Sequence, residues 1–385
     1  MQRHFFNVDE INLPDFTALC SQKVSSEDYT FSVDIQQRVV IYEGEHIQSL
    51  MSTQQALDLK SELHHCIKDG PGVMVVRQAF QDMKVIDRAT ELFQEIIEEE
   101  NTSEKHRGDH FAKVGENERI WNALQKFCER DPEAFVAYYS NPVLCFVTEA
   151  WLGPFFQMTS QVNIVKPGGQ AQKPHRDYHL GFQENSLVSQ YPLSAQILSQ
   201  FLTLQESVAH TDMDLSTGST MMLPFSHQYP LGYMAWRDSK FIEYFQKHAV
   251  QLALKKGDAV FFSPALFHAA GTNFKSSDRI ANLLQASSAF GKTMESVDRT
   301  KMTKLIYPVL LEGTCSKQLS SKETNAVCSA VVDGYSFPTN LDYDSPREGS
   351  TPGTALALIN QALNEAWPTD LFYDCLDEAT IRRLA

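Results

Sequence analysis

Hydrophobic residues in the N-terminal part of the chain recur mainly at helical spacing. Helices are predicted over residues 52–67 and 81–100, and an interrupted helix pair over residues 119–152. Alternating or continuous apolar runs predict one or two strands within residues 29–41 and a buried strand at residues 73–76. The most regular helical pattern is made by Val85, Ile86, Ala89, Leu92, Phe93, Ile96 and Ile97.

From Met158 onward the pattern changes to short strands. Turn-forming residues, for example at 167–169 and 271–273, separate the apolar runs. Short strands at this spacing favour a sandwich or a barrel. The predicted strands cover residues 158–165, 199–205, 220–224, 251–254, 259–263 and 280–286.

The pattern of hydrophobic and polar residues changes again after residue 301. A loop rich in Pro, Ser and Gly is predicted at residues 345–353, followed by helices at residues 354–367 and 370–384. We therefore expect an α+β fold in three parts: an N-terminal strand-containing extension, a central β-core with its packing helices, and a C-terminal helical appendage. These parts are assigned to residues 1–50, 51–300 and 301–385.

The amino-acid composition argues against several classes of binding partner and of structural site. The chain has 48 acidic and 33 basic side chains and a net charge of −15, which disfavours nucleic-acid binding because such a surface repels phosphates. Seven scattered cysteines with no Cys-x-x-Cys pair exclude a disulfide scaffold and a zinc ribbon. The most apolar stretch, residues 143–156, is too short to span a bilayer, and no secretory signal is visible. We expect a cytoplasmic protein with no membrane partner and make no prediction of its oligomeric state.

Candidate chemistry begins with a His-x-Asp triplet at His175 and Asp177. On an extended strand the residues i and i+2 point to the same face, so these two side chains could hold one metal ion. A second triplet, His210-Thr211-Asp212, shows that the motif alone is not specific. The second triplet lies in a polar stretch that is predicted to be a solvated loop, so the first is favoured.

A third ligand would have to come from elsewhere in the chain. His268 follows the predicted strand at 259–263, and Arg279 stands eleven residues later at the start of the next strand. A single histidine after an apolar strand is more often a core residue, and a single arginine there is more often a rim charge. Adjacent antiparallel strands could nevertheless bring both side chains into one cavity with His175.

This combination resembles the phytanoyl-CoA dioxygenase-like (PhyH) family of Fe(II)/2-oxoglutarate-dependent oxygenases. Besides the His-x-Asp, the distal histidine and the arginine, the segments 218–227 (GSTMMLPFSH) and 257–273 are similar to family motifs. The likeness runs over roughly residues 70–290. Two positions depart from the pattern: Phe225 replaces a usual glycine, and Ala270 replaces a hydroxyl residue that some members use to hold 2-oxoglutarate.

The resemblance implies a fold, a metal site and a reaction. The β-core would be a double-stranded β-helix, also called a jelly roll or cupin-like fold. His175, Asp177 and His268 would bind Fe(II), and Arg279 would pair with the far carboxylate of 2-oxoglutarate. With O2, the enzyme would hydroxylate an unactivated C–H bond of a small-molecule substrate, releasing succinate and CO2.

Further site residues are predicted around this centre. Gln161 and Asn163 share one face of a predicted strand and would either contact the C1 carboxylate or the substrate, or face solvent. Thr272 could replace the missing hydroxyl contact to 2-oxoglutarate. Tyr178 and His179 could line the substrate mouth. His227 belongs to a structural segment of the family and is not predicted to be a ligand.

Two other functions fit part of the pattern. A catalytically inactive jelly-roll binding protein would have no need of all four polar residues. A zinc hydrolase could use the same two histidines and the aspartate, but it leaves Arg279 unexplained. The sequence does not identify the substrate, because one fold supports many functions.

Overall fold

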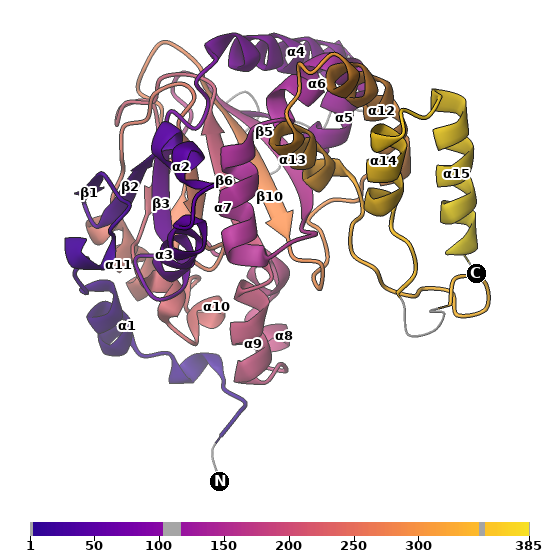
Figure 1. The fold of residues 1–385 in the computed structure, drawn as a ribbon. Coiled ribbons are helices and arrows are strands. Elements are labelled where there is room, and N and C mark those ends of the chain that lie inside the picture. The colour runs from indigo at the N-terminus through magenta and orange to yellow at the C-terminus, as the bar shows by residue number, and fades with distance from the viewer. Residues whose placement is uncertain (1–2, 103–116, 346–350, 385) are drawn as a thin grey trace.

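The computed structural model describes residues 3–102, 117–345 and 351–384, and it contains one large mixed sheet with helices on one face (Figure 1). The strand order is β1-β2-β3-β8-β6-β10-β5-β4. The strands of this sheet are β1 (Asp34–Gln36), β2 (Val39–Glu43), β3 (Val73–Arg77), β4 (Asn117–Ile120), β5 (Gln157–Val165), β6 (Thr203–Ala209), β8 (Ala259–Phe262) and β10 (Arg279–Ser287).

The centre of the sheet is built from strands that are far apart in the sequence. β10 pairs antiparallel with β5 along its whole length, from Arg279 opposite Val165 to Ser287 opposite Gln157. On its other side β10 pairs with β6, and β6 pairs with β8. The pairing of β2 with β3 is parallel. Most residues of the central strands β6 and β10 are therefore paired on both sides, which makes this part of the fold a rigid platform.

A second layer faces the cavity side of the large sheet. β7 (Met221–Met222) pairs with β9 (His268–Ala269), and isolated bridges extend this layer by joining His175 to His268 and Met222 to Val250. Two layers of mostly antiparallel strands, with connections that cross between them, form the predicted jelly-roll core. The α+β double-stranded β-helix expected from the sequence is confirmed.

Helices from both ends of the core cover the outer face of the large sheet. Asn141 caps α7 by accepting hydrogen bonds from the amides of Val143 and Leu144, and Asp131 caps α6 in the same way. In Figure 1, α7 lies across the front of the sheet. The helices of this layer are α2 (Gly44–Leu50), α3 (Ala56–Lys68), α4 (Met83–Thr102), α5 (Ala123–Arg130), α6 (Pro132–Tyr139), α7 (Pro142–Leu152), α12 (Arg299–Cys315) and α13 (Ser321–Val331).

A smaller apolar cluster closes the other end of the core. It is centred on Phe16 of α1, whose ring contacts those of Tyr229, Phe241 and Phe267. The helices around it are α1 (Leu13–Cys20), α8 (Asn185–Val188), α9 (Leu193–Gln200), α10 (Gly232–Ala235) and α11 (Ser239–His248).

The sequence located most elements, but three predictions are wrong. The predicted start of the helix pair at 119 is strand β4, and residues 199–200 end helix α9, so that β6 begins only at 203. Residues 251–254 form no strand beyond one bridge of Leu254 to Met213. The strand at 117–120 is decided by its pairing with β5, about which local patterning carries no information.

The described residues of the C-terminal region form four helices. α14 (Ala355–Asn364) and α15 (Thr369–Arg382) match the predicted pair, and they lie at the opposite end of the molecule from β1 (Figure 1). α12 and α13 were not predicted, and they contribute Met302, Ile306 and Val327 to the main core cluster. The loop predicted at 345–353 falls largely outside the described residues. Among the described helices, none combines the length and the apolar character that a bilayer span requires.

Candidate metal centre and active-site cavity

Two segments distant in sequence meet to form the site. The extended stretch at His175 pairs with β9, with the His175 amide donating to the His268 carbonyl at 3.0 Å and the His268 amide donating back at 3.2 Å. Asn273 fastens the preceding turn, since its side-chain amide donates to the Val165 carbonyl at 3.0 Å. This backbone pairing places the two imidazoles side by side, with ring centroids 4.4 Å apart.

The side chains of His175, Asp177 and His268 converge on one point. Their candidate ligand atoms all lie within 4.8 Å of one another. Nε2 of His175 is 3.6 Å from one carboxylate oxygen of Asp177, and Nε2 of His268 is 3.4 Å from the other. Two imidazoles and one carboxylate on one side of a cavity form the facial donor set that suits a non-haem iron site.

Second contacts orient both imidazoles. Nδ1 of His175 lies 3.0 Å from the Lys173 carbonyl, and Nδ1 of His268 lies 2.8 Å from the Leu266 carbonyl. A carbonyl can only accept, so Nδ1 carries the proton in each ring and the Nε2 lone pair points to the shared centre. The donor set therefore fits a divalent metal ion.

Charges inside the site determine the state of Asp177. Burial raises the pKa of this carboxyl, but the two neighbouring histidines and a hydrogen bond from Gln205 outweigh burial and hold its pKa well below the usual range. Burial lowers the pKa of His175, which favours the neutral ring. An ionised Asp177 carboxylate and a neutral His175 ring are the protonation states that metal binding requires.

A cavity of about 520 Å³ opens beside the three ligands and contains the predicted arginine. Arg279 is 2% exposed, and its guanidinium donates to the Gly218 carbonyl at 3.3 Å. Within the described residues no carboxylate forms an ion pair with Arg279. Burial, with a smaller contribution from the charge of Arg119, lowers the pKa of Arg279 to about 10. A buried cation without an acidic partner is costly, so this pocket fits an anionic ligand.

Of the other predicted site residues, Gln161 and Asn163 line the same cavity. They are 2% and 3% exposed, so they do not face solvent. The carbonyl oxygen of Gln161 accepts a hydrogen bond from Arg119 at 2.8 Å. The ligands that these two amides contact stay a prediction.

Three predicted residues do not line this cavity. The Thr272 hydroxyl accepts a hydrogen bond from the Ala171 amide at 2.9 Å and so braces a loop. Tyr178 and His179 follow the His-x-Asp, but both have positive φ angles, of 61° and 36°, which turn the chain away from its extended path. The alternating strand pattern that would have directed the side chains of Tyr178 and His179 toward the mouth of the cavity ends at Asp177.

Arg176, between two candidate ligands, points to the opposite side. Its guanidinium donates to the carbonyl oxygens of Ser226 and Tyr229 and lies over the rings of Tyr233 and Phe267. It thereby supports the segment that contains Phe225, the residue in place of the family glycine. Phe225 adopts φ 69° and ψ −7°, a left-handed conformation that glycine reaches at lower cost.

The remaining histidines of the motifs are structural. Nε2 of His227 lies 3.1 Å from the Lys68 carbonyl, as expected for a residue outside the metal site. The prediction of a solvated loop at His210 is wrong. Its two ring nitrogens lie 2.8 Å from the Thr90 hydroxyl and 2.9 Å from the Tyr138 hydroxyl, on the helix-covered face of the sheet. Asp212 is exposed and pairs with Lys255, so this triplet binds no metal together.

Several cavity residues were missed by sequence reasoning. Arg119 places a second guanidinium in the cavity, Gln205 contacts Asp177, and Trp121, Phe182 and Trp236 supply aromatic walls. Arg119 and Trp121 were assigned to a helix, and Gln205 ended a predicted strand without a motif. Only the pairing of β4 with β5 and of β6 with β10 brings them to the metal ligands.

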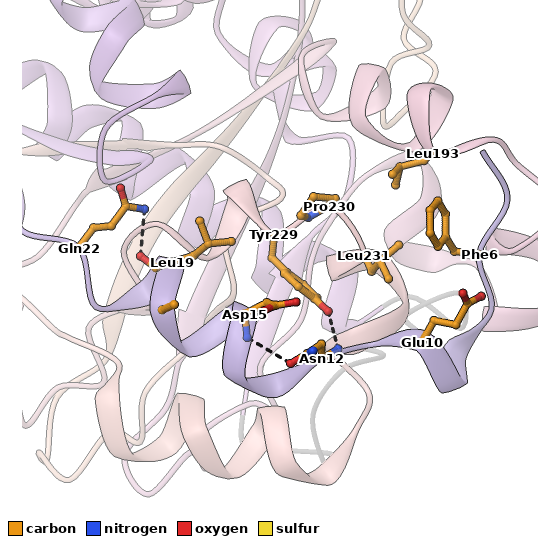
Figure 2. Close-up of a pocket in the computed structure, with 11 residues that line it drawn as sticks. Phe6, Glu10, Asn12, Asp15, Leu19, Gln22, Leu193, Tyr229, Pro230 and Leu231 are labelled. Carbon is orange, nitrogen blue, oxygen red and sulfur yellow. Dashed lines mark hydrogen bonds between the residues drawn. The ribbon is translucent and has the colours of Figure 1, made fainter. Parts of the chain in front are cut away.

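A cavity of about 690 Å³ lies between α1 and the loop at 229–231 (Figure 2). Its walls include Leu19, Leu193 and Leu231, with the carboxylates of Glu10 and Asp15 at its edge. The hydroxyl of Tyr229 accepts a hydrogen bond from the Asn12 amide at 2.6 Å across it. Among the described residues that line it there is no histidine and no cationic side chain, so it offers neither an imidazole ligand nor an anion site.

Glu206 provides a prediction about stability and pH. Burial raises its pKa to about 8, against a smaller opposite effect of the Thr148 hydroxyl, which contacts it at 2.5 Å. The native state therefore binds a proton more tightly than the unfolded state. This stabilisation is complete below the carboxyl's ordinary pKa and is lost as pH rises through about 8, at a rate of up to about 1.4 kcal/mol per pH unit.

We expect Glu206→Gln to flatten the dependence of the free energy of unfolding on pH between 5 and 8. Urea titrations at several pH values measure this, with Glu133→Gln as the control because Glu133 is exposed on α6. Parallel curves for Glu206→Gln and the wild type would show that Glu206 is ionised in the native state.

Comparisons with known proteins agree with this geometry. The model of the family "Phytanoyl-CoA dioxygenase (PhyH)" matches residues 69–281. The peroxisomal phytanoyl-CoA dioxygenase of Bos taurus is 28% identical over 174 residues, which are 41% of this chain and 46% of that protein. The chain therefore aligns with less than half of that relative.

Solved structures with a similar fold were also found. The carbocyclase SnoK from nogalamycin biosynthesis is 16% identical with a TM-score of 0.45, and the match covers 67% of this chain and 92% of that one. EctD from S. alaskensis, solved with 2-oxoglutarate and 5-hydroxyectoine, is 15% identical with a TM-score of 0.43, covering 58% and 74%. Since the family model spans more than half of its residues and includes all three candidate ligands and Arg279, the chain belongs to the phytanoyl-CoA dioxygenase (PhyH) family of Fe(II)/2-oxoglutarate oxygenases.

Proposed function

We propose that this protein is an Fe(II)- and 2-oxoglutarate-dependent dioxygenase that hydroxylates an unactivated C–H bond of a small molecule, with release of succinate and CO2. One observation carries the proposal: the His175, Asp177 and His268 cluster shares a cavity with a buried guanidinium that has no acidic partner among the described residues. The cluster supplies a metal site, and the guanidinium supplies the fixed cation that a dicarboxylate co-substrate needs.

Each side chain has a defined task in this proposal. Nε2 of both histidines and one oxygen of Asp177 hold the iron. Arg279 binds the far carboxylate of 2-oxoglutarate through its planar fork, and Asn163 and Gln161, which line the same cavity, contact the other end of that molecule or the substrate. The bound metal and co-substrate supply the oxidising chemistry, and the protein supplies position and exclusion of water.

The substrate would enter from the side of Phe182. Its ring lines the cavity and is 47% exposed, which places it where the cavity meets solvent. Trp121 and Trp236 line the same cavity, and flat aromatic walls favour a substrate with an apolar portion. The substrate is therefore a small molecule that packs its reacting carbon between these rings and the metal.

The alternatives explain less of the site. A zinc hydrolase would use the same three ligands and would leave the buried Arg279 without a function. An inactive binding protein would leave two imidazoles aligned through their Nδ1 contacts toward an empty point. Both alternatives remain as outcomes of the experiment below.

The test uses the purified full chain without oxygen. Addition of Fe(II) and then 2-oxoglutarate should produce a weak visible charge-transfer band, and admission of air should yield succinate, with a metabolite library used to find the substrate that accelerates its release. A protein that binds Zn(II), gives no band with Fe(II) and 2-oxoglutarate, and hydrolyses test esters would support the hydrolase. A protein that binds no metal would overturn both enzyme assignments.

Other predictions made from the sequence stay predictions. They are the division of the chain near residues 50 and 300, the cytoplasmic location, and the absence of nucleic-acid and membrane partners.

A further inference from the structure

We propose that Gln205 is a positioning residue of the metal centre, whose side-chain amide holds one oxygen of Asp177 so that the carboxylate binds the metal through the other oxygen alone. This inference rests on the proposed function, because it concerns the same metal site. The inference adds to the metal site a residue, Gln205, that belongs to no recognisable sequence motif.

Gln205 is held firmly in place. It lies in β6, paired with Gln285 on β10 and with Phe262 on β8, so that its backbone is fixed from both sides. The side chain is 8% exposed and lines the cavity. A buried side chain on a central strand has few alternative positions, so it can transmit a fixed geometry to its neighbour.

The contact with Asp177 is short and has a defined direction. Nε2 of Gln205 lies 2.5 Å from Oδ2 of Asp177. An ionised carboxylate only accepts hydrogen bonds, so the NH2 group of the amide must face it. The backbone amide of Asp177 donates to the Pro264 carbonyl at 2.9 Å, which fixes the other end of the residue. The carboxylate is thus restrained at both ends.

The hydrogen bond from Gln205 determines how many coordination positions of the metal Asp177 can occupy. Oδ2, which lies 3.4 Å from Nε2 of His268, accepts the hydrogen bond from Gln205, so Oδ1, which lies 3.6 Å from Nε2 of His175, is the oxygen left free for the metal. Together with the two imidazoles, a carboxylate bound through one oxygen would leave three of the six positions of an octahedral ion open. Binding through both oxygens would remove one of these positions, and 2-oxoglutarate with O2 needs all three.

The experiment compares two glutamines that face one cavity. Gln205→Met keeps the length and volume of the side chain and removes the donor. Gln285→Met is the matched control, because Gln285 is the cross-strand partner, is 4% exposed and lines the same cavity without contacting Asp177. Mn(II) is the probe, since it replaces Fe(II) without redox chemistry, and free Mn(II) is measured by its paramagnetic resonance signal.

We expect Gln205→Met to weaken Mn(II) binding by about 10-fold or more, because the carboxylate of Asp177 is then no longer oriented toward the metal, and Gln285→Met to change it by less than about twofold. In the anaerobic Fe(II) form, Gln205→Met should also give a weaker visible band with 2-oxoglutarate at equal iron occupancy. A purely structural role for Gln205 would lower the melting temperature without changing the band per bound iron.

Two results would overturn the inference: unchanged Mn(II) binding in Gln205→Met, or equal weakening in both variants. If Gln205→Met does not fold, Gln205→Asn repeats the comparison, because its amide is one methylene too short to reach Asp177. Failure of the proposed function would give a different result. The wild type itself would then bind no Mn(II), or its Mn(II) binding would not be removed by His268→Ala.

Discussion

Replacing His175 or His268 by alanine is expected to abolish metal binding and, with it, turnover of 2-oxoglutarate. The three ligand atoms lie within 4.8 Å of one another, and the described residues offer no further histidine, cysteine or acidic group to that cluster. Loss of an outer contact alone typically weakens metal affinity by about 10–100-fold, so the loss of a direct ligand should exceed about 100-fold.

The fold should survive these substitutions. The pairing between the two segments runs through the backbone amides and carbonyls of His175 and His268, which alanine retains. Mn(II) titration, succinate release and the melting temperature of the metal-free protein together measure the effect. His248→Ala is the control, because this exposed histidine of α11 stacks on Tyr244 far from the cluster. Succinate release that persists in His268→Ala would exclude that residue as a ligand.

Replacing Arg279 by leucine is expected to separate the binding of co-substrate from the binding of metal. Removal of one partner of a buried charge pair typically costs about 2–5 kcal/mol, which corresponds to a loss of about 30-fold or more in the affinity for 2-oxoglutarate. Metal affinity should stay the same or increase slightly, because a cation is removed from the neighbourhood of a divalent ion. The two affinities therefore move in different directions.

Arg279→Lys refines this test. The ammonium keeps the charge and loses the planar fork, so the affinity for 2-oxoglutarate should fall by an intermediate amount. Arg299→Lys is the control, because Arg299 also donates only to carbonyls, those of Met158, Ala330 and Val331, and does not line the cavity. Equal losses of metal and co-substrate affinity in Arg279→Leu would show that this residue supports the fold of the site and does not bind the carboxylate.

The two His-x-Asp triplets show how much of the metal site can be predicted from the sequence. The spacing is identical at His175 and at His210, and only the surrounding pattern favoured the first. In the structure His210 lies between Thr90 and Tyr138 on the helix-covered face, and His175 faces the cavity and pairs with His268. The sequence favoured the triplet that lies beside His268 in the structure, but it gave a wrong reason for rejecting the other, since His210 is buried and not solvated.

The sequence by itself determined the properties that depend on short stretches of chain. The spacing of His175 and Asp177, the position of Arg279 at the start of a strand, and the jelly-roll class all follow from local periodicity, turn residues and the resemblance to the family. Local patterning works here because a strand presents every second side chain to one face regardless of its partner.

Only the tertiary structure decided which residues share the cavity. Arg119 and Gln205 reach the metal ligands through the pairing of β4 with β5 and of β6 with β10, and the positive φ at Tyr178 turns two expected residues away. Strand order and register are set by the burial of whole faces of the sheet. Because many distant residues contribute to that burial, no single position in the sequence reveals the order or the register.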